Sequence, residues 1–379
     1  MTFARISAHR TQRQSGGSTR RQRELNPLIL ESCMYPDALV RLTEDVLDRS
    51  AARASLIPSA APAGVGPSKL KGVSAGLVAR TANLRILGKS PLGIYLRIAE
   101  GVWDALPASL KGLPPAIAYG RLMHALVRSS GQRQQYFGTF FVRNRPQLQL
   151  ICRLAGEHPR GAPLRVAVLG CSIGAEAYSL AWAIRSAAPD LSLRIDGVDI
   201  SPEVLEVARE GLYPIGVAEL ANEPLCERLT REEIEHIFET EPRGLRVRPW
   251  IREGIRWQVG DLRDPAIGDV FGRYDVVVAN DFLCHMDPAE AGACLRNIAR
   301  LVAEGGHLVV SGVDLDMRTD VAADLGWKPV TDLIEEIHEG DRSLRRSWPW
   351  RYWGLEPLDS GRHDWSLRYA SVFQLGGAS

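Results

Sequence analysis

The sequence predicts a doubly wound α/β domain with a smaller helical region in front of it. An apolar run at 164–170 has the character of a buried strand, stops at a turn of small residues and opens into a helix. Strand-like and helix-like segments then alternate along the chain, which is typical of a parallel sheet with helices on both faces. Asp199 ends the next apolar run, at 193–198. An acidic residue there, beside a helix start with free N–H groups, is the layout of a nucleotide-type pocket.

The composition excludes several classes of protein. At 379 residues, of which 45% are hydrophobic, the chain can bury one large core and a smaller one. A net charge of +1 gives no bulk attraction for nucleic acid. No apolar run reaches about 18 residues, so we expect no membrane insertion. The 6 cysteines form no Cys-x-x-Cys pair, so we expect no metal site and no dense disulfide framework, and reduced thiols fit a cytoplasmic protein.

The first third of the chain is predicted to be a basic tail followed by helices. Residues 1–25 are rich in Arg, Ser, Gln and Gly, which is typical of a disordered tail; a mitochondrial transit peptide is the alternative. Residues 26–135 contain a linker rich in Ala, Pro, Ser and Gly near 51–68. The spacing of apolar residues predicts helices at 92–106 and 116–129.

Residues 136–379 are predicted to form the α/β domain. Its strands are expected near 164–170, 193–199, 255–260, 274–280, 306–312 and 367–375, and its helices near 175–187, 202–210, 288–302 and 319–325. An insertion at 211–254 contains a capping box at Thr230, which starts a helix, and a hairpin at 244–248. The aromatic segment 348–353 is expected to cover the sheet, or alternatively to line a pocket for an apolar or ring-bearing substrate.

The turn after the first strand holds the first group of candidate ligand-binding residues. These residues are Gly170, Cys171, Ser172, Gly174 and Glu176. Small residues let the backbone approach a ligand closely, and the first turn of the helix presents N–H groups to it. The glycine pattern is not Gly-x-Gly-x-x-Gly, so a tight turn without a ligand is the alternative.

Two acids follow the next two strands at the same edge of the sheet. Asp199 is placed to grip a ribose diol, because it ends the second strand. Asp261, which follows the third strand, could accept a hydrogen bond from an adenine amino group. A solvated loop acid and a helix cap are the respective alternatives.

The fourth strand runs out into polar residues where open α/β sheets place their chemistry. Asn280 and Asp281 come first, and His285 follows them. His285 could act on a proton or orient a carboxylate; a histidine packed in the loop is the alternative. Upstream, Arg143 stands among apolar residues and is expected to meet an anion, while Thr139 could cover a cofactor. The alternative there is a domain-packing segment with a surface arginine.

These residues resemble the CheR-type chemotaxis-receptor methyltransferases, which use S-adenosylmethionine to methylate glutamate side chains of proteins. The similarity spans about 136–315. Residues 139–143 resemble that family's T-x-F-F-R element, and 170–179 resemble its C-S-T-G-E-E-P-Y-S element. The pair at 199–200 matches a ribose-binding Asp-Ile, and 207–213 is similar to A-R-x-G-x-Y.

The resemblance implies a Rossmann-like class I methyltransferase fold and S-adenosylmethionine as cofactor. It implies that Glu176 meets the amino end of the cofactor, Asp199 its ribose, and Asp261 with Leu262 its adenine. Arg143 would lie near the methyl group, and Arg143, Asn280 and His285 are the candidate catalytic residues. The candidate cofactor-binding residues are Thr139, Arg143, Gly170, Cys171, Ser172, Gly174, Glu176, Asp199, Ile200, Asp261, Leu262, Asn280 and Asp281.

Residues 279–286 depart from the family's C-R-N-x-x-I-Y-F segment. Asn280 stands in place of Arg, Asp281 in place of Asn, and His285 in place of Tyr. The loss of the Arg cation makes an anionic glutamate a weaker candidate for the methyl acceptor. The presence of His285 suggests an acceptor that needs a base. Two kinds of acceptor therefore stay open: a protein carboxylate, or another oxygen or nitrogen nucleophile on a protein or a small molecule.

The residues also leave two rival functions open. The departures at the end of the fourth strand would fit a cofactor-binding regulatory or scaffold protein that has lost catalysis. A nicotinamide dehydrogenase shares the general fold, but the glycine pattern differs from its fingerprint. The sequence leaves the oligomeric state open.

Overall fold

The computed structural model describes residues 91–130, 139–159, 161–214, 225–340, 348–350 and 354–376. The expected basic tail and the linker near 51–68 lie outside the described residues. Within these described ranges, no helix has both the length and the apolar character needed to cross a membrane.

Seven strands form the central sheet, in the order β6-β2-β1-β7-β8-β10-β9. Their bounds are β1 Leu164–Leu169, β2 Leu193–Asp199, β6 Ile255–Val259, β7 Tyr274–Val278, β8 Val302–Val309, β9 Lys328–Pro329 and β10 Val372–Gln374. The first five strands in that order are parallel, whereas β10 is antiparallel to both of its neighbours. The chain leaves β1 toward β2 on one side and later returns to β7 on the other, so the carboxyl ends of β1 and β7 mark a switch point, where such sheets bind ligands.

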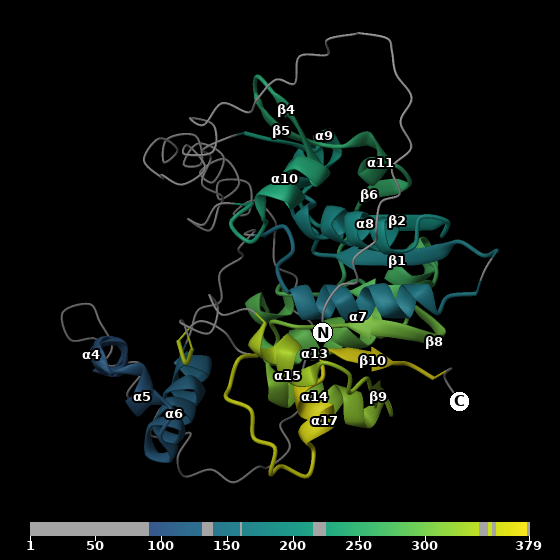
Figure 1. Ribbon diagram of the computed structural model, residues 1–379. Helices are drawn as coiled ribbons and strands as arrows, with labels where there is room; N and C mark the ends of the chain where they lie inside the picture. The colour runs from purple at the N-terminus through teal and green to yellow at the C-terminus, as the bar shows by residue number, and fades with distance from the viewer. Residues whose placement is uncertain are drawn as a thin grey trace, which may run out of the picture.

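Helices cover both faces of this sheet (Figure 1). The helices of the domain are α7 Arg145–Gly156, α8 Ala175–Ala187, α9 Pro202–Glu210, α12 Ile267–Phe271, α13 Pro288–Ala299, α14 Leu315–Asp324, α15 Ile334–Glu339 and α17 Trp365–Tyr369, with a 3-10 turn, η1, at Leu283–His285. Val166 and Val168 of β1 belong to the core with α7 and α8, whereas Ala167 and Leu169 belong to the core with α13 and α14. Successive side chains of a strand point to opposite faces, so a strand covered on both sides is apolar throughout.

The predicted alternation of strands and helices is confirmed. The observed β1, β2, β6, β7, α8 and α9 lie within two residues of their expected bounds. However, the strand expected at 306–312 is β8, which begins at Val302, inside the segment expected to be helical at 288–302. It ends at Val309, before Gly312 turns the chain with a positive φ of 58°.

Two further boundaries near the C-terminus differ from the expectation. The helix expected at 319–325 begins earlier, at Leu315, because Asp314 caps it by accepting a hydrogen bond from the backbone N–H of residue 316. The strand expected at 367–375 is a helix, α17, followed by the short β10. The helix buries Arg368 against Glu356, which an alternating apolar and polar pattern does not reveal.

The insertion forms a small second sheet, which lies at one end of the main sheet in Figure 1. Its elements are β3 Leu212–Tyr213, α10 Arg231–Ile237, β4 Phe238–Glu241, β5 Gly244–Val247 and α11 Pro249–Arg252, with strand order β3-β5-β4. The capping box is confirmed: Thr230 Oγ1 accepts from the Glu233 amide at 3.2 Å, and the Glu233 carboxylate accepts from the Thr230 amide at 2.8 Å.

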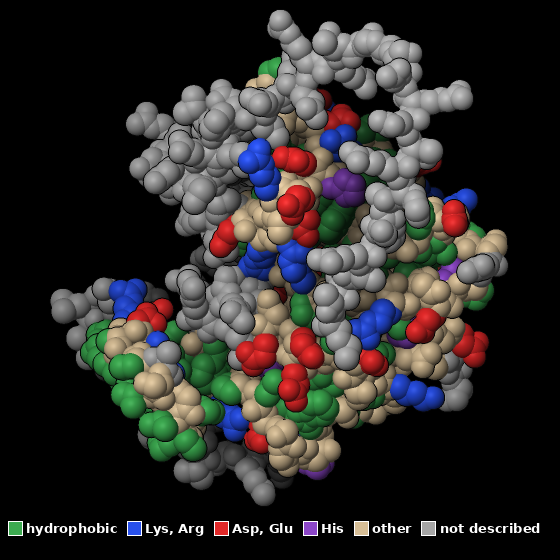
Figure 2. Space-filling view, in the orientation of Figure 1, with side chains coloured by type: hydrophobic (Ala, Val, Ile, Leu, Met, Phe, Trp, Pro, Cys, Tyr) green, Lys and Arg blue, Asp and Glu red, His purple; other side chains and the backbone are tan. Residues whose placement is uncertain are grey.

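Among the described residues, three helices precede the domain: α4 Pro91–Ala105, α5 Ala108–Lys111 and α6 Pro114–Ser130. They confirm the helices expected at 92–106 and 116–129. Trp348 and Trp350 pack with Trp103 and Met123 of this region, and the Trp103 and Trp348 ring centroids are 5.5 Å apart. The described part of the aromatic segment therefore binds the helical region and neither covers the sheet nor lines the candidate site. Apolar side chains also gather on the outer surface of α4–α6 (Figure 2).

Candidate functional site

An open cleft lies at the carboxyl ends of β1, β2, β6 and β7. Its cavity volume is about 330 Å³, which lies within the range of small-molecule and cofactor sites. The expected residues that line it are Thr139, Arg143, Gly170, Cys171, Ser172, Glu176, Asp199, Ile200, Asp261, Leu262, Asn280, Asp281 and His285. Elements far apart in the sequence thus bring all of the candidate residues except Gly174 to one cavity.

Gly174 lies behind the cleft, not in its wall. Its φ is +89°, and a β-carbon there would lie 2.7 Å from the Trp257 ring and 3.0 Å from Ala208 Cβ. The residue is glycine because the turn needs this backbone conformation and because Trp257 packs against it. Gly174 does not line the cleft, so its expected role in letting the backbone approach a ligand stays a prediction.

Asp199 ties the ends of β1 and β2 together. Its buried carboxylate accepts hydrogen bonds from the backbone N–H groups of Ser172 at 2.8 Å and Ser201 at 3.0 Å. Burial raises the pKa of Asp199, and these backbone hydrogen bonds oppose the rise. Ser172 has a positive φ of 50°, so this turn is held in a conformation that non-glycine residues seldom adopt. The carboxylate is thereby fixed at the cleft wall.

Glu176 lies one residue into α8, where its carboxyl group faces the cleft. Its Oε1 accepts a hydrogen bond from Asn280 Nδ2 at 2.7 Å. Burial raises the pKa of Glu176 to about 7, and the Asn280 hydrogen bond and the Arg143 charge limit the rise. A carboxylate that has lost its hydration gains most from a cationic ligand group, such as an ammonium.

Arg143 and Asp281 form an ion pair across the cleft, with Arg143 Nε 3.2 Å from Asp281 Oδ2. Their side chains are only 16% and 14% exposed, so solvent screens the pair weakly. Val142 and Asp281 have positive φ values of 53° and 62°. Backbone strain of this kind is characteristic of functional sites. The anion that the sequence predicted for Arg143 is thus, in part, the chain's own Asp281.

The segment that carries Arg143 is held by the insertion, a relationship that the sequence did not reveal. Arg145 donates two hydrogen bonds to the Glu233 carboxylate, both at 2.6 Å, and one to the Arg228 carbonyl. Arg228 in turn donates to the Arg143 carbonyl at 2.8 Å and lies 4.3 Å from the Phe140 ring centroid. Paired charges in opposite segments, such as Arg145 and Glu233, leave no local sequence signal.

The expected adenine end of the cleft holds a second ion pair. Asp261 accepts hydrogen bonds from Arg263 Nη2 at 2.7 Å and Nε at 2.9 Å, and this pairing lowers the pKa of Asp261. Its carboxylate is therefore engaged before any ligand enters. Leu262 is buried beside it and gives this end an apolar wall. His285 also lines the cleft, on η1.

A second, narrower compartment adjoins the cleft, and its cavity volume is about 80 Å³. The two share Phe140, Arg143, Glu176, Asn280 and Asp281, which form the boundary between them. His285 does not line this second compartment. The wall of the second compartment also contains residues from α7, α8, α14 and α15, and from the segments after β8 and before β10.

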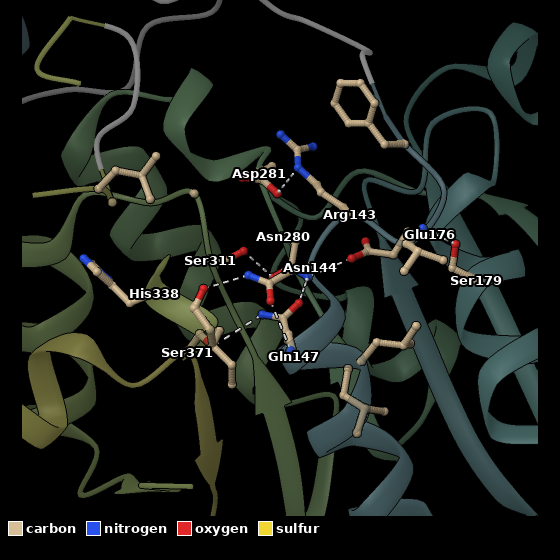
Figure 3. Close-up of a pocket in the computed structure, with 18 of the residues that line it drawn as sticks. Arg143, Asn144, Gln147, Glu176, Ser179, Asn280, Asp281, Ser311, His338 and Ser371 are labelled. Carbon is tan, nitrogen blue, oxygen red and sulfur yellow. Dashed lines mark hydrogen bonds and ion pairs between the residues drawn. The ribbon is translucent and has the colours of Figure 1, made fainter. Parts of the chain in front are cut away.

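A chain of uncharged hydrogen bonds runs from the boundary into this compartment (Figure 3). Asn280 Nδ2 donates to Gln147 Oε1 at 2.8 Å, and Asn280 Oδ1 accepts from the Ser311 hydroxyl at 2.8 Å. Gln147 Nε2 donates to Ser371 Oγ at 3.3 Å. Sequence reasoning missed Gln147, Ser311 and Ser371. Gln147 could have been found, because it is a polar residue on the face of α7 that is otherwise apolar: Leu150, Ile151 and Ala155.

No group of three or more His, Cys, Asp or Glu residues is placed to hold a metal ion among the described residues. The acids that line the cleft are engaged with other partners. Asp199 accepts from backbone N–H groups, Asp261 and Glu290 pair with Arg263, Asp281 pairs with Arg143, and Glu176 accepts from Asn280.

Comparison with known proteins gives one family match. Residues 138–319 match the family described as CheR methyltransferase, SAM binding domain. A probable biofilm formation methyltransferase WspC of Pseudomonas putida is 30% identical over 196 residues, which are 50% of this chain and 42% of that protein. Its counterpart in Pseudomonas aeruginosa is 24% identical over 55% of this chain and 48% of that protein. A probable chemotaxis protein methyltransferase of Rhizobium etli is 26% identical over 40% of this chain and 55% of that protein. The chain matches about half the length of each of these curated relatives.

Proposed function

The chain is a divergent member of the CheR methyltransferase family, and from this premise we propose that it transfers a methyl group to an oxygen or nitrogen nucleophile. The donor is S-adenosylmethionine, bound in the cleft, and the nucleophile enters the second compartment. The observation that carries the proposal is the shared boundary: Arg143, Glu176, Asn280 and Asp281 face both spaces.

The polar groups of the cleft fit this cofactor. Asp199 ends β2 as a fixed, buried carboxylate and would accept hydrogen bonds from the ribose hydroxyls. Glu176, at the boundary, would bind the ammonium group. Leu262 and the backbone beside Asp261 would hold the adenine ring, while Arg263 keeps the Asp261 carboxylate occupied. These assignments set the reactive end of the cofactor beside Asn280 and Asp281.

Methyl transfer from a sulfonium requires little acid–base catalysis by the protein. The bound cofactor supplies an electrophilic methyl group, and the protein must align a nucleophile with it and exclude water. Alignment of this kind can supply about 7–11 kcal/mol of a reaction barrier. Arg143, held from behind by Arg228, and Asp281, held by its strained backbone, are the rigid groups at the boundary.

The roles of the boundary residues depend on the acceptor. A carboxylate, such as a protein glutamate, would need no base, and Arg143 would steady it. A hydroxyl or an amine must lose a proton, and His285 or Asp281 would receive it. A compartment built next to the cofactor cleft counts against a purely regulatory or scaffold role, because cofactor binding alone does not need one.

The first test is the binding of S-adenosylhomocysteine, measured by isothermal titration calorimetry. We expect micromolar binding that is lost in Asp199→Ala and kept in Asp269→Asn, an exposed carboxylate outside the cleft. Transfer of labelled methyl from S-adenosylmethionine to components of a cell extract is the second test. Absence of binding by the unaltered protein would refute the cofactor assignment, and binding without any transfer would favour the scaffold role.

A further inference from the structure

We infer that the second compartment receives an uncharged acceptor with a proton to lose, a hydroxyl or a neutral amine, and that Asp281 accepts the hydrogen bond from this group. The inference rests on the proposed methyl transfer and specifies its substrate class. It follows from the charges at the boundary, from the mostly uncharged side chains of the remaining wall and from the fixed position of Asp281.

The charges at the boundary do not favour a carboxylate. Among its residues, Arg143 is the cation, and it faces the carboxyl groups of Asp281 and Glu176. Asp281 already neutralises Arg143, so an incoming carboxylate would meet a paired cation and two like charges. Binding of the cofactor's ammonium would occupy Glu176, but the Arg143–Asp281 pair would remain. An uncharged acceptor avoids this repulsion.

Arg318 is a second cation in the wall of the compartment, and its hydrogen bonds give it a structural role. Its terminal nitrogens donate to the backbone carbonyls of Val310 at 2.9 Å and of Arg368 at 2.5 Å. Burial and the nearby Arg368 lower the pKa of Arg318 to about 9. The side chain thus ties α14 to the segments around β8 and β10 through its two terminal nitrogens, which donate to the backbone.

Away from the Arg143–Asp281 pair, Glu176 and Arg318, the polar groups of the compartment are mostly uncharged dipoles. Asn280 uses both the nitrogen and the oxygen of its amide, toward Gln147, Glu176 and Ser311. The apolar members of the remaining wall are Val142, Leu148, Ile151, Leu180, Leu315, Ile337 and Leu355, and its polar members include Asn144, Ser179, His338, Tyr369 and Ser371. An ion would lose its hydration here with little compensation, whereas an uncharged polar group would exchange hydrogen bonds at low cost.

Of Asp281 and His285, Asp281 is the better-placed acceptor for the proton. It lies on both the cleft and the compartment, whereas His285 lines the cleft alone. His338 also lines the compartment, but its Nε2 is within hydrogen-bond distance of the Glu356 carbonyl oxygen, at 2.7 Å. The backbone N–H of Asp281 donates to the Ser311 carbonyl at 2.9 Å, and Gly312 leaves the space that the Asp281 carboxylate fills. In the transfer step, the acceptor oxygen or nitrogen bonds to the methyl carbon, the carbon–sulfur bond breaks with its electrons going to sulfur, and the acceptor's proton passes to the Asp281 carboxylate.

The chemical linkage of the transferred methyl tests this inference. Cell extract is incubated with the full chain and S-adenosylmethionine labelled in the methyl group, and the products are treated with mild alkali. Methyl ethers and methylamines keep the label, whereas carboxyl methyl esters release it as methanol. We expect stable label. Release as methanol overturns the inference while the proposed methyl transfer stands, and absence of any label despite cofactor binding refutes both.

A charge change at position 281 provides a second readout. In Asp281→Asn the Arg143 guanidinium loses its partner, so we expect transfer to the stable products to fall at least tenfold while affinity for S-adenosylhomocysteine changes less than threefold. Any residual label should shift toward the alkali-labile form. Asp269→Asn is the matched control and should leave both the yield and the linkage unchanged. Equal transfer by Asp281→Asn and the unaltered protein would overturn the role of Asp281.

Discussion

Asp281 Oδ1 occupies the space of the side chain that Gly312 lacks: a β-carbon at position 312 would lie 2.0 Å from this oxygen. Both residues have positive φ values, 62° for Asp281 and 58° for Gly312. The loops that follow β7 and β8 therefore interlock at the boundary between cleft and compartment. The position of the carboxylate depends on the backbone of a neighbouring loop as well as on its own.

Substitution of Gly312 by Ala should displace the Asp281 carboxylate. We expect a loss of about 1–3 kcal/mol in the free energy of unfolding, from backbone strain and the steric clash together. We also expect at least a tenfold loss of methyl transfer with little change in S-adenosylhomocysteine affinity. Urea denaturation, transfer assays and calorimetry would measure the three quantities.

Gly305→Ala is a matched control for that substitution. Gly305 has a positive φ of 72°, but no atom lies within 4 Å of the position that a β-carbon would take there. The Gly305→Ala variant should therefore show the free-energy cost of backbone strain without the displacement of Asp281. Its methyl transfer should equal that of the unaltered protein. Equal loss of transfer in both variants would show that strain alone explains the effect.

The affinity for the cofactor should depend on the protonation of Glu176. Burial raises the pKa of this group to about 7, so the carboxyl is mostly neutral at pH 6 and mostly ionised at pH 8. Since only the ionised form attracts the cofactor's ammonium, S-adenosylhomocysteine should bind about tenfold more weakly at pH 6 than at pH 8. Calorimetry across this range would measure the change.

The variant Glu176→Gln checks the origin of that pH dependence. It keeps the shape of the side chain but removes the charge, so binding at pH 8 should weaken and the profile between pH 6 and 8 should become flat. A profile that keeps its slope in this variant would assign the titration to another group.

Replacement of His285 by Ala separates the two candidate proton acceptors. His285 lines the cleft but not the second compartment, so we expect methyl transfer to fall less than threefold. A loss of a hundredfold at unchanged cofactor affinity, about 2.7 kcal/mol of transition-state stabilisation, would make His285 the base instead of Asp281.

The contact between Arg145 and Glu233 should matter more for activity than for stability. The Arg145 side chain is 43% exposed, and ion pairs this open to solvent contribute only about 0–1 kcal/mol to folding. Arg145→Lys loses the paired geometry with Glu233 and loosens the segment that carries Arg143. We expect a several-fold loss of turnover with an almost unchanged denaturation midpoint; a large stability loss without a change in turnover would contradict this.

The parts of the fold that follow local rules could be predicted from the sequence. β1 and α8 could be located in the sequence, because a buried parallel strand is apolar on both faces and because a turn of small residues separates the two elements. Thr230 and Glu233 give the start of α10 by their spacing alone. α7 has no counterpart among the expected helices, although Asn144 caps it and a proline stands in its first turn.

The candidate cleft could be predicted because its residues sit at strand ends, which a linear pattern locates. The second compartment could not, because it is made by contacts between segments that are far apart in the chain. Gln147, Ser311 and Ser371 meet only after α7, β8 and β10 have come together. The pairing of Arg143 with Asp281 is likewise invisible in either local segment, yet it decides the charge of the site.

The placement of β10 between β8 and β9 has a consequence for biosynthesis. Ser371, next to β10, completes the second compartment, whereas the residues that line the cleft all lie between 139 and 290. A ribosome adds residues in order, and a domain generally folds as a unit. Because β10 joins β8 to β9 and places Val372 and Phe373 in the core, the central sheet can be completed only when nearly the whole chain has been made. A translation product that stops before residue 371 would leave the edge of β8 without its partner strand.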